Sequence, residues 1–333
     1  MNNKKKVLIT GATGMVGSYM IEYILDNHLD WDIIACRRRH SDTTNVEHLL
    51  NQAGITWTQV DLIDAHEVEE MIKWFEPQKI FHLAAQSFVP RSWKAPVETI
   101  QVNVIGTINL FEACRKYCPT TIIHQAGSSE EYGLVFPEET PITEENVLRP
   151  QSPYACSKIM QENLGRTYHQ SYGLRVITTR AFNHTGVRRG EEFVLSQIAK
   201  QAAEINVGIK DSFVLGNLKA KRDFTDVRDI VRAYWLASEK CNPGESYNIC
   251  SGIAYSIEEL LFMVKEAAGL LDASVIKDQS RMRPADVPIL LGSCDKFKEA
   301  TNWIIEFNIK DTIVGMYENW LYKLGGGIAE QIY

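Results

Sequence analysis

The sequence lacks the features that mark several classes of protein. No apolar run approaches the roughly 20 residues that a membrane span needs, and the run at residues 7–9 is too short for the core of a signal peptide. Positive charge is not in excess, because 35 Lys and Arg stand against 42 Asp and Glu, for a formal charge of −7. This balance argues against nucleic-acid or anionic-membrane partners, although it permits a local basic pocket for phosphate. We therefore expect a cytoplasmic protein with no nucleic-acid or membrane partner.

Cysteine also gives no sign of a structural framework. The chain has 7 cysteines, an odd number, and none of them forms a CxxC pair. Cys114 and Cys118 are spaced as neighbours on a helix, but no second pair follows at the spacing of a zinc site. We expect reduced thiols, as in a cytosolic protein, with no disulfide and no metal.

What the sequence does contain is an ordinary globular composition, 45% hydrophobic and 23% charged, with a regular alternation in its first half. Short β-branched runs predict buried strands, and amphipathic stretches between them predict helices. The predicted strands are 7–10, 33–35, 56–60, 80–83, 121–125 and 176–179; the predicted helices are 15–26, 45–51, 65–75, 97–117 and 153–171. This order predicts an α/β fold with a doubly wound parallel sheet, the Rossmann arrangement.

The rhythm changes after about residue 180, which indicates a second, smaller domain. Residues 226–239 resemble one more helix of the first domain, followed by a strand at 246–250. We predict that residues 1–180 and about 222–248 form a nucleotide-binding domain. Residues 181–221 and 249–333, with mixed signals and several Pro or Gly breaks, are predicted to form the smaller substrate domain.

A GxxGxxG pattern joins the first predicted strand to the first helix. Glycine allows backbone amides to approach a pyrophosphate closely, and the start of a helix favours its negative charge. The alternative is a tight strand–helix turn without a ligand, but the strand–loop–helix context favours a dinucleotide site. The predicted cofactor contacts here are Gly11, Thr13, Gly14, Met15, Val16 and Gly17.

The residues after the second strand bear on which dinucleotide binds. An NAD site usually has Asp or Glu here for the ribose 2′-hydroxyl, whereas this chain has Cys36, followed by Arg37, Arg38 and Arg39. Guanidinium groups suit a 2′-phosphate, so NADP is the predicted cofactor; a solvated basic loop is the alternative. Further predicted cofactor contacts follow the third and fourth strands: Asp61, Leu62, Leu83, Ala84 and Ala85.

Two segments supply candidate catalytic groups. Tyr154 and Lys158 are one helical turn apart, and the ammonium and the helix start at Ser152 are expected to lower the pKa of Tyr154. Both residues are also predicted to contact the cofactor. Ser128, after the fifth strand, could share a proton with Tyr154, and Glu130 could serve as a separate acid or base. The alternatives are a simple turn at Ser128-Ser129 and a solvated loop at Glu130-Glu131.

Across nearly its whole length the chain resembles extended short-chain dehydrogenases/reductases. Within them it is most similar to GDP-mannose 4,6-dehydratases and to the related GDP-4-keto-6-deoxy-D-mannose reductases. The residues that carry the resemblance are Ala84-Ala85-Gln86-Ser87, Ser128-Ser129-Glu130, Arg180-Ala181-Phe182-Asn183-His184, Arg188-Arg189-Gly190-Glu191, Leu215-Gly216-Asn217-Leu218, Lys221-Arg222-Asp223 and Arg283-Pro284.

The resemblance implies one of two reactions on a nucleotide-diphosphate sugar. In the dehydratase, Tyr154 takes the C4 hydroxyl proton as hydride passes from C4 to NADP, Glu130 takes the C5 proton, water leaves from C6, and the hydride then returns to C6. In the reductase, a 4-ketone is reduced, Tyr154 protonates it, and Glu130 has no necessary role. We expect the dehydratase and keep the reductase as the alternative. Another nucleotide-sugar epimerase or dehydratase, or a non-catalytic NADP-binding regulator, is a lesser alternative.

The same resemblance implies the substrate contacts and the assembly. Arg222 and Arg283 are candidates for the diphosphate, Ser87 and Asn183 for the sugar, and Val194 and Asn217 for the base. His184 is either at this site or a hydrogen-bonded core histidine. Members of the family commonly form dimers or tetramers, so we expect a homodimer or homotetramer.

Overall fold

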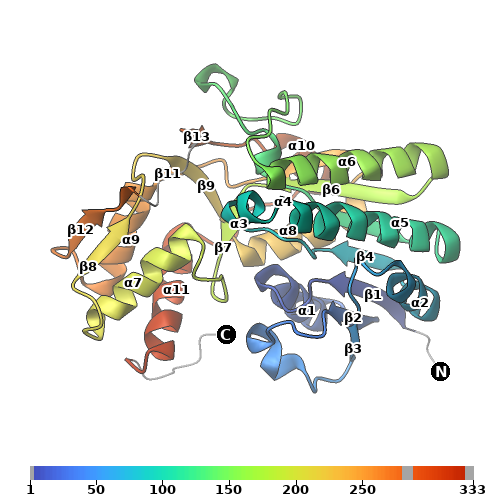
Figure 1. The fold of residues 1–333 in the computed structure, drawn as a ribbon, viewed down its shortest axis with the longest axis horizontal. Coiled ribbons are helices and arrows are strands. Elements are labelled where there is room, and N and C mark those ends of the chain that lie inside the picture. The colour runs from blue at the N-terminus through green and yellow to red at the C-terminus, as the bar shows by residue number, and fades with distance from the viewer. Residues whose placement is uncertain (1–3, 280–287, 327–333) are drawn as a thin grey trace.

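A seven-stranded parallel sheet forms the centre of the larger part of the molecule (Figure 1). The structure, a computed structural model, describes residues 4–279 and 288–326. The strand order is β10-β6-β5-β4-β1-β2-β3. The strands are β1 (Lys5–Thr10), β2 (Trp31–Arg37), β3 (Ile55–Gln59), β4 (Lys79–His82), β5 (Ile122–Ala126), β6 (Arg175–Ala181) and β10 (Ser246–Ile249). The predicted doubly wound α/β fold is therefore confirmed.

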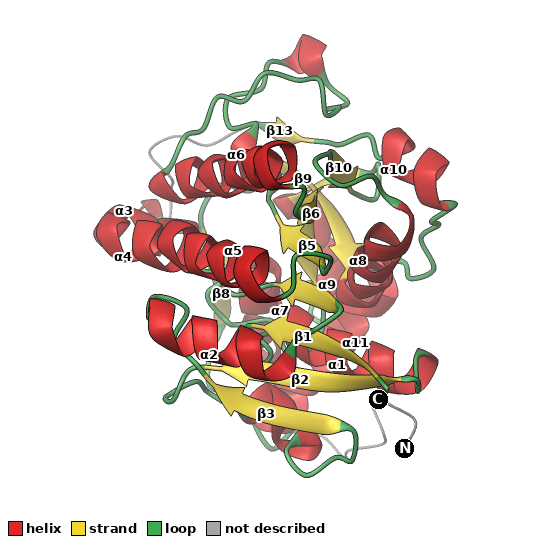
Figure 2. Cartoon of the chain, turned by 90° about the vertical axis from the view of Figure 1, so that its right-hand side faces the viewer, coloured by secondary structure: helices red, strands yellow, loops and turns green. Residues whose placement is uncertain are grey.

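Helices cover both faces of this sheet, because its strands are apolar on both sides (Figure 2). On one face lie α1 (Met15–Asn27) and α8 (Val227–Lys240), whose apolar side chains share a hydrophobic cluster with β1, β2 and β4. On the other face lie α2 (Ala65–Phe75), α5 (Gly106–Tyr117) and α6 (Pro153–Tyr172). Ser152 caps α6 as predicted, since its hydroxyl accepts a hydrogen bond from the Ala155 amide at 3.1 Å.

Two predicted helices differ from the structure. The segment predicted at 45–51 is the 3₁₀ helix η1 (Thr44–Leu49), as is common for short helical pieces. The segment predicted at 97–117 is interrupted: α4 (Pro96–Ile100) is followed by a π-helical turn, η2 (Gln101–Ile105), and then by α5. A short helix, α3 (Val89–Lys94), precedes them and was not predicted.

Most of the remaining elements pack into a smaller unit beside the sheet, around a separate hydrophobic cluster between α7, α9 and α11 (Figure 1). The strands outside the central sheet are β7 (Asn183–Thr185), β8 (Ser212–Leu215), β9 (Lys221–Asp226), β11 (Ala254–Ser256), β12 (Ser274–Lys277) and β13 (Ile289–Leu290). The helices of this unit are α7 (Val194–Asn206), α9 (Ile257–Ala268) and α11 (Ile309–Lys323). Helix α10 (Asp295–Thr301) packs instead against α8 and β10, and its Phe297 belongs to the hydrophobic cluster of the larger part. Two 3₁₀ turns, η3 (Ser129–Glu131) and η4 (Pro137–Glu139), follow β5.

The connection between the two units places functional segments from both beside one cleft. β9 pairs with β7, β11 and β13 in a small sheet, although residues from about 222 were predicted to belong to the larger domain. The division into two domains at the predicted boundaries stays a prediction. Within the described residues, no helix is long and apolar enough to cross a membrane.

Candidate active site

A cleft of about 990 Å³ opens at the carboxyl ends of β1, β2, β4 and β5. In a doubly wound sheet this edge is where ligands bind, next to the point at which the strand order reverses. Here that point lies between β1 and β4. The predicted site residues that line the cleft are Gly11, Thr13, Gly14, Met15, Val16, Gly17, Arg37, Arg38, Asp61, Leu62, Leu83, Ala84, Ala85, Ser87, Ser128, Glu130, Tyr154, Lys158, Asn183, Val194, Asn217 and Arg222.

Two predicted residues are not among these. Arg39 is exposed and does not line the cleft, although its two neighbours in the arginine run do. Arg283 lies outside the described residues. The predicted residues that do line the cleft lie as much as 200 positions or more apart in the sequence, from the glycine loop to β9.

The glycine loop has the geometry that a dinucleotide needs. Gly11 has φ of +69°, and a Cβ placed there would lie 2.9 Å from the backbone of Ala84. A Cβ at Gly17 would lie 2.3 Å from the carbonyl oxygen of Gly11. Gly14 begins α1 without a side-chain cap, and the first turn of this described helix has no acidic residue. Its amide groups are therefore open to an anion, which fits a bound pyrophosphate.

The end of β2 also fits a phosphate. Cys36 is buried in the strand, so its thiol takes the place of the usual carboxylate without presenting a charge. The guanidinium Nε of Arg37 is buried and has no hydrogen-bond partner among the described residues. An unpaired buried donor of this kind favours an anionic ligand.

The candidate catalytic groups lie on the opposite wall. Ser128 and Tyr154 are each 8% exposed, and the Ser128 side chain is near enough to the phenol to lower its pKa. The Nζ of Lys158 donates to the carbonyl oxygen of Ala126 at 2.8 Å and lies 5.8 Å from the centre of the Tyr154 ring. Burial lowers the pKa of Lys158 to about 8.

The sequence predicts a lowered pKa for Tyr154, whereas the pKa is raised in the structure. Burial raises the pKa of Tyr154 above its ordinary value, and the hydrogen bond from Ser128 offsets only part of that shift. Arg189 lowers the pKa through its charge, whereas Glu130 and Glu131 raise it. The sequence argument considered the ammonium and the helix start but could not include the desolvation of the phenol.

The adjacent acidic residues Glu130 and Glu131 occupy different environments. Glu130 is half-buried and lines the cleft beside Ser128 and Tyr154. Glu131 is fully buried, and its Oε1 accepts a hydrogen bond from the Ser128 amide at 2.8 Å. Its Oε2 lies 3.7 Å from the Nε of Arg180. A solvated loop at Glu130-Glu131 is thus excluded for Glu131, which shapes the turn that presents Ser128.

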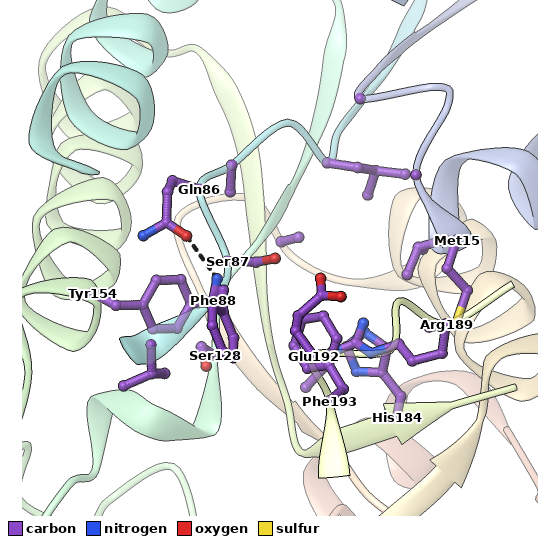
Figure 3. A pocket seen from close by; sticks show the side chains of 18 of the residues that line it. Met15, Gln86, Ser87, Phe88, Ser128, Tyr154, His184, Arg189, Glu192 and Phe193 are labelled. Atoms are coloured by element: carbon purple, nitrogen blue, oxygen red, sulfur yellow. Dashed lines mark hydrogen bonds between the residues drawn. The ribbon is translucent and has the colours of Figure 1, made fainter. Parts of the chain in front are cut away.

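Gln86 supports the segment that carries Ser87 (Figure 3). Its Oε1 accepts from the Phe88 amide at 2.7 Å, and its Nε2 donates to Thr99 Oγ1 at 3.0 Å. The Gln86 amide in turn donates to Oδ1 of Asn103, in the π-helical turn, at 2.8 Å. Asn103 Nδ2 also donates to Ser157 Oγ at 2.9 Å, so the π-helical turn connects the Ser87 segment to the helix of Tyr154.

The smaller unit contributes the remaining wall. Asn183 Nδ2 is buried and has no hydrogen-bond partner among the described residues, which fits a predicted sugar contact. Arg189, Glu192 and Phe193 also line the cleft, and sequence reasoning did not select them as site residues. The Arg189 guanidinium stacks on the Phe193 ring at 3.4 Å, and Phe193 meets Phe88 across the cleft at 5.8 Å between ring centroids (Figure 3). The only sequence signal for them was the family resemblance around Arg188-Arg189.

His184 was predicted to be either a site residue or a hydrogen-bonded core histidine, and it has features of both. It lines the cleft, and its Nδ1 is hydrogen-bonded to the carbonyl oxygen of Phe182 at 3.0 Å. Burial lowers the pKa of His184 to about 4, so the ring is neutral near pH 7. With Nδ1 donating to that carbonyl, Nε2 is left as an acceptor.

Comparison with known proteins identifies the family. The sequence model of the family described as GDP-mannose 4,6 dehydratase matches residues 8–316. The chain belongs to this family. Within the GDP-mannose 4,6-dehydratase family, it is similar to the GDP-mannose 4,6-dehydratase of Vibrio cholerae, at 31% identity over 94% of this chain and 93% of the relative.

The family match also includes a protein named for the other reaction. The chain is 29% identical to the GDP-6-deoxy-D-mannose reductase of Pseudomonas aeruginosa, over 95% of this chain and 97% of the relative. Among solved structures, it is similar to RMD from Pseudomonas aeruginosa complexed with NADPH, with a TM-score of 0.84 and 28% identity over 96% of this chain and 100% of that one. Within the described residues, no cluster of His, Cys, Asp and Glu could hold a metal ion.

Proposed function

We propose that this protein is a GDP-mannose 4,6-dehydratase that uses NADP and releases GDP-4-keto-6-deoxy-D-mannose. The observation that carries the proposal is the position of Glu130. Its half-buried carboxylate lines the same cleft as Ser128 and Tyr154 and influences the phenol electrostatically. A dehydratase needs this second acid–base group, whereas a reductase needs only the proton donor.

The chain's own residues divide the proton transfers between them. In its phenolate form, which burial disfavours and the Ser128 side chain favours, Tyr154 would take the proton of the sugar C4 hydroxyl, and Ser128 would orient the reacting oxygen. A bound nicotinamide supplies the hydride acceptance and return. Once C4 is a ketone, the C5 proton is acidic, and Glu130 removes it and assists loss of water from C6. Lys158 holds its ammonium against the Ala126 carbonyl, beneath the phenol.

The predicted ligand contacts support NADP and a nucleotide-diphosphate sugar. Arg37 and Arg38 would hold the 2′-phosphate, and the glycine loop the pyrophosphate. Arg222 would bind the substrate diphosphate, with Ser87 and Asn183 at the sugar. We further propose a cytoplasmic homodimer or homotetramer, which light scattering of the purified protein would test.

The second candidate is the NADPH-dependent GDP-4-keto-6-deoxy-D-mannose reductase. The similarity to the Pseudomonas aeruginosa reductase over nearly the full length of both chains favours it. The same Ser128–Tyr154 pair would protonate a 4-ketone, and Glu130 would then be dispensable.

Mass spectrometry with GDP-mannose and catalytic NADP⁺, without added reductant, separates the two. A product lighter by one water, with no net NADPH, is expected of the dehydratase. No reaction with GDP-mannose, together with NADPH consumption when GDP-4-keto-6-deoxymannose is supplied, would establish the reductase instead. Glu130→Gln should block the first activity and spare the second, and Glu138→Gln, at an exposed position on η4, is the matched control.

A further inference from the structure

Arg188 has an unusual backbone conformation for its place in the chain. Three non-glycine residues of the described chain have positive φ: Glu76, Arg188 and Asn302. Glu76 and Asn302 end α2 and α10, where a left-handed residue is common. Arg188, with φ of 71°, instead occupies the third position of the turn 186–189, which the Arg189 amide closes onto the Gly186 carbonyl at 3.2 Å. Turns of this geometry favour Gly at that position, so an arginine there is strained.

A carboxylate from a distant helix holds this strained residue. Arg188 donates from Nη1 to Glu22 Oε2 at 2.9 Å and from Nη2 to Glu22 Oε1 at 2.6 Å. Its guanidinium also lies 4.5 Å from the centre of the Tyr19 ring. The Arg188 side chain is 9% exposed and that of Glu22 24%, so the pair is partly shielded from water. Two parallel bonds of this kind fix orientation as well as distance.

The turn determines the direction of the next side chain. Arg189 lines the cleft, stacked on Phe193, and Figure 3 shows it on the side of Met15 at the start of α1. The Arg189 carbonyl accepts a hydrogen bond from Ser196 Oγ at 2.8 Å, which anchors the far side of the turn in α7. A change of the φ angle at Arg188 would therefore rotate Arg189 relative to an anchored backbone.

Glu22 also contacts η1, the 3₁₀ helix that follows Arg37 and Arg38 in the chain. Its Oε1 lies 2.6 Å from the Nε2 of His48 in η1. From the same 3₁₀ helix, Asn45 donates to the Thr13 carbonyl of the glycine loop at 3.2 Å. One carboxylate on α1 thus connects the cofactor side of the cleft to the turn that carries Arg189.

We propose that Glu22 is a positioning residue, which holds the 186–189 turn in its left-handed conformation so that Arg189 points into the cleft. The inference rests on the proposed function only in taking the cleft as the NADP and nucleotide-sugar site. Glu22 does not line the cleft and contacts no reacting group.

A double-mutant comparison tests this role. Glycine adopts the left-handed conformation without support, so Arg188→Gly keeps the turn and should make Glu22 dispensable. We expect Glu22→Ala to raise the NADPH dissociation constant about tenfold, because the strained turn would relax and Arg189 would no longer be held in the cleft. In an Arg188→Gly background the same change should add less than about twofold, because the turn then needs no ion pair. Glu70→Gln, which removes the exposed ion pair with Lys73, is the control for loss of a surface charge.

The readouts are NADPH binding by fluorescence, the KM and kcat for GDP-mannose, and the thermal midpoint of the protein without cofactor. Wild-type NADPH binding in Glu22→Ala would overturn the proposal, as would a tenfold loss that persists in the Arg188→Gly background. If Glu22→Ala does not fold, Glu22→Gln, which fits the same space, provides the same comparison. NADPH binding is measured without turnover, so an error in the proposed substrate leaves this test unaffected.

Discussion

Replacing Glu131 should separate the stability of the active-site loop from its chemistry. Glu131 and Glu162 are both buried against one guanidinium, that of Arg180, which lies 2.6 Å from Glu162 and 3.7 Å from Glu131. Burial, followed by the charge of Glu162, raises the pKa of Glu131 well above its ordinary value. The pKa of Glu162 is lowered, despite burial, by its hydrogen bonds and charge interaction with Arg180. Glu162 therefore carries the charge that balances Arg180, and Glu131 is favoured in its protonated form.

This arrangement predicts opposite results for two substitutions of Glu131. Glu131→Gln keeps the acceptor for the Ser128 amide, so at about pH 5, where Glu131 is protonated in the folded protein, the unfolding free energy should change by less than about 1 kcal/mol. Glu131→Ala leaves that buried amide unpaired, at about 1–3 kcal/mol, and removes a methylene worth about 0.8 kcal/mol, so we expect a loss of about 2–4 kcal/mol. Ser128 would also lose its orientation, so turnover should fall in the alanine variant and be kept in the glutamine variant.

The pH dependence of the unfolding free energy is a second test of the protonation of Glu131. A carboxyl group with a raised pKa in the folded protein binds its proton more tightly there, so its contribution is lost as pH rises above the ordinary value of 4.5. Glutamine does not titrate, so Glu131→Gln should gain stability relative to wild type as pH rises above about 5. Urea denaturation of the three proteins across this range measures both effects. Equal destabilisation by glutamine and alanine would refute the reasoning, since only a charged Glu131 would then be supporting the loop.

Three further substitutions test the rest of the site. Tyr154→Phe should lower kcat more than about 100-fold while NADP binding, measured by calorimetry, is kept, because only the proton carrier is lost; near-wild-type turnover would remove Tyr154 from the mechanism. Arg37→Ala should weaken NADP binding about tenfold and leave NAD binding unchanged, since one charge-assisted hydrogen bond to the 2′-phosphate is lost; equal losses for both dinucleotides would contradict this. Gly11→Ala should cost about 1–3 kcal/mol of unfolding free energy, because φ is +69° and the new Cβ would lie 2.9 Å from Ala84; an unchanged urea midpoint would show that the loop can relax.

Local patterns were sufficient for much of the fold. Strand residues buried on both faces give short β-branched runs, and α2 was predicted with the bounds that the structure shows. The glycine loop and the Tyr154–Lys158 spacing were also readable, because each depends on neighbours within one or two turns of the chain. The interruption of the helix at residues 101–105 was not readable, since the π-helical turn accompanies contacts of Asn103 with Gln86 and Ser157.

In the active site, too, some properties could not be predicted from the local sequence. Glu130 and Glu131 are identical in type and adjacent in sequence, yet only the packing of Arg180 and Glu162 distinguishes a buried structural carboxylate from one that lines the cleft. The pKa of Tyr154 depends on desolvation by residues distant in the chain, which the local spacing with Lys158 does not contain.

The sequence by itself determined the order of strands and helices, the place of the dinucleotide loop and the family of the chain, because these depend on short-range periodicity and ordered motifs. Only the tertiary structure decided which charges are paired and which face the cleft. Arg188 and Arg189 are consecutive arginines, but the first pairs with Glu22, 166 positions away, and the second lines the cleft. Burial and Coulomb interaction act through space, so their outcome is set by contacts that the chain makes only once it is folded.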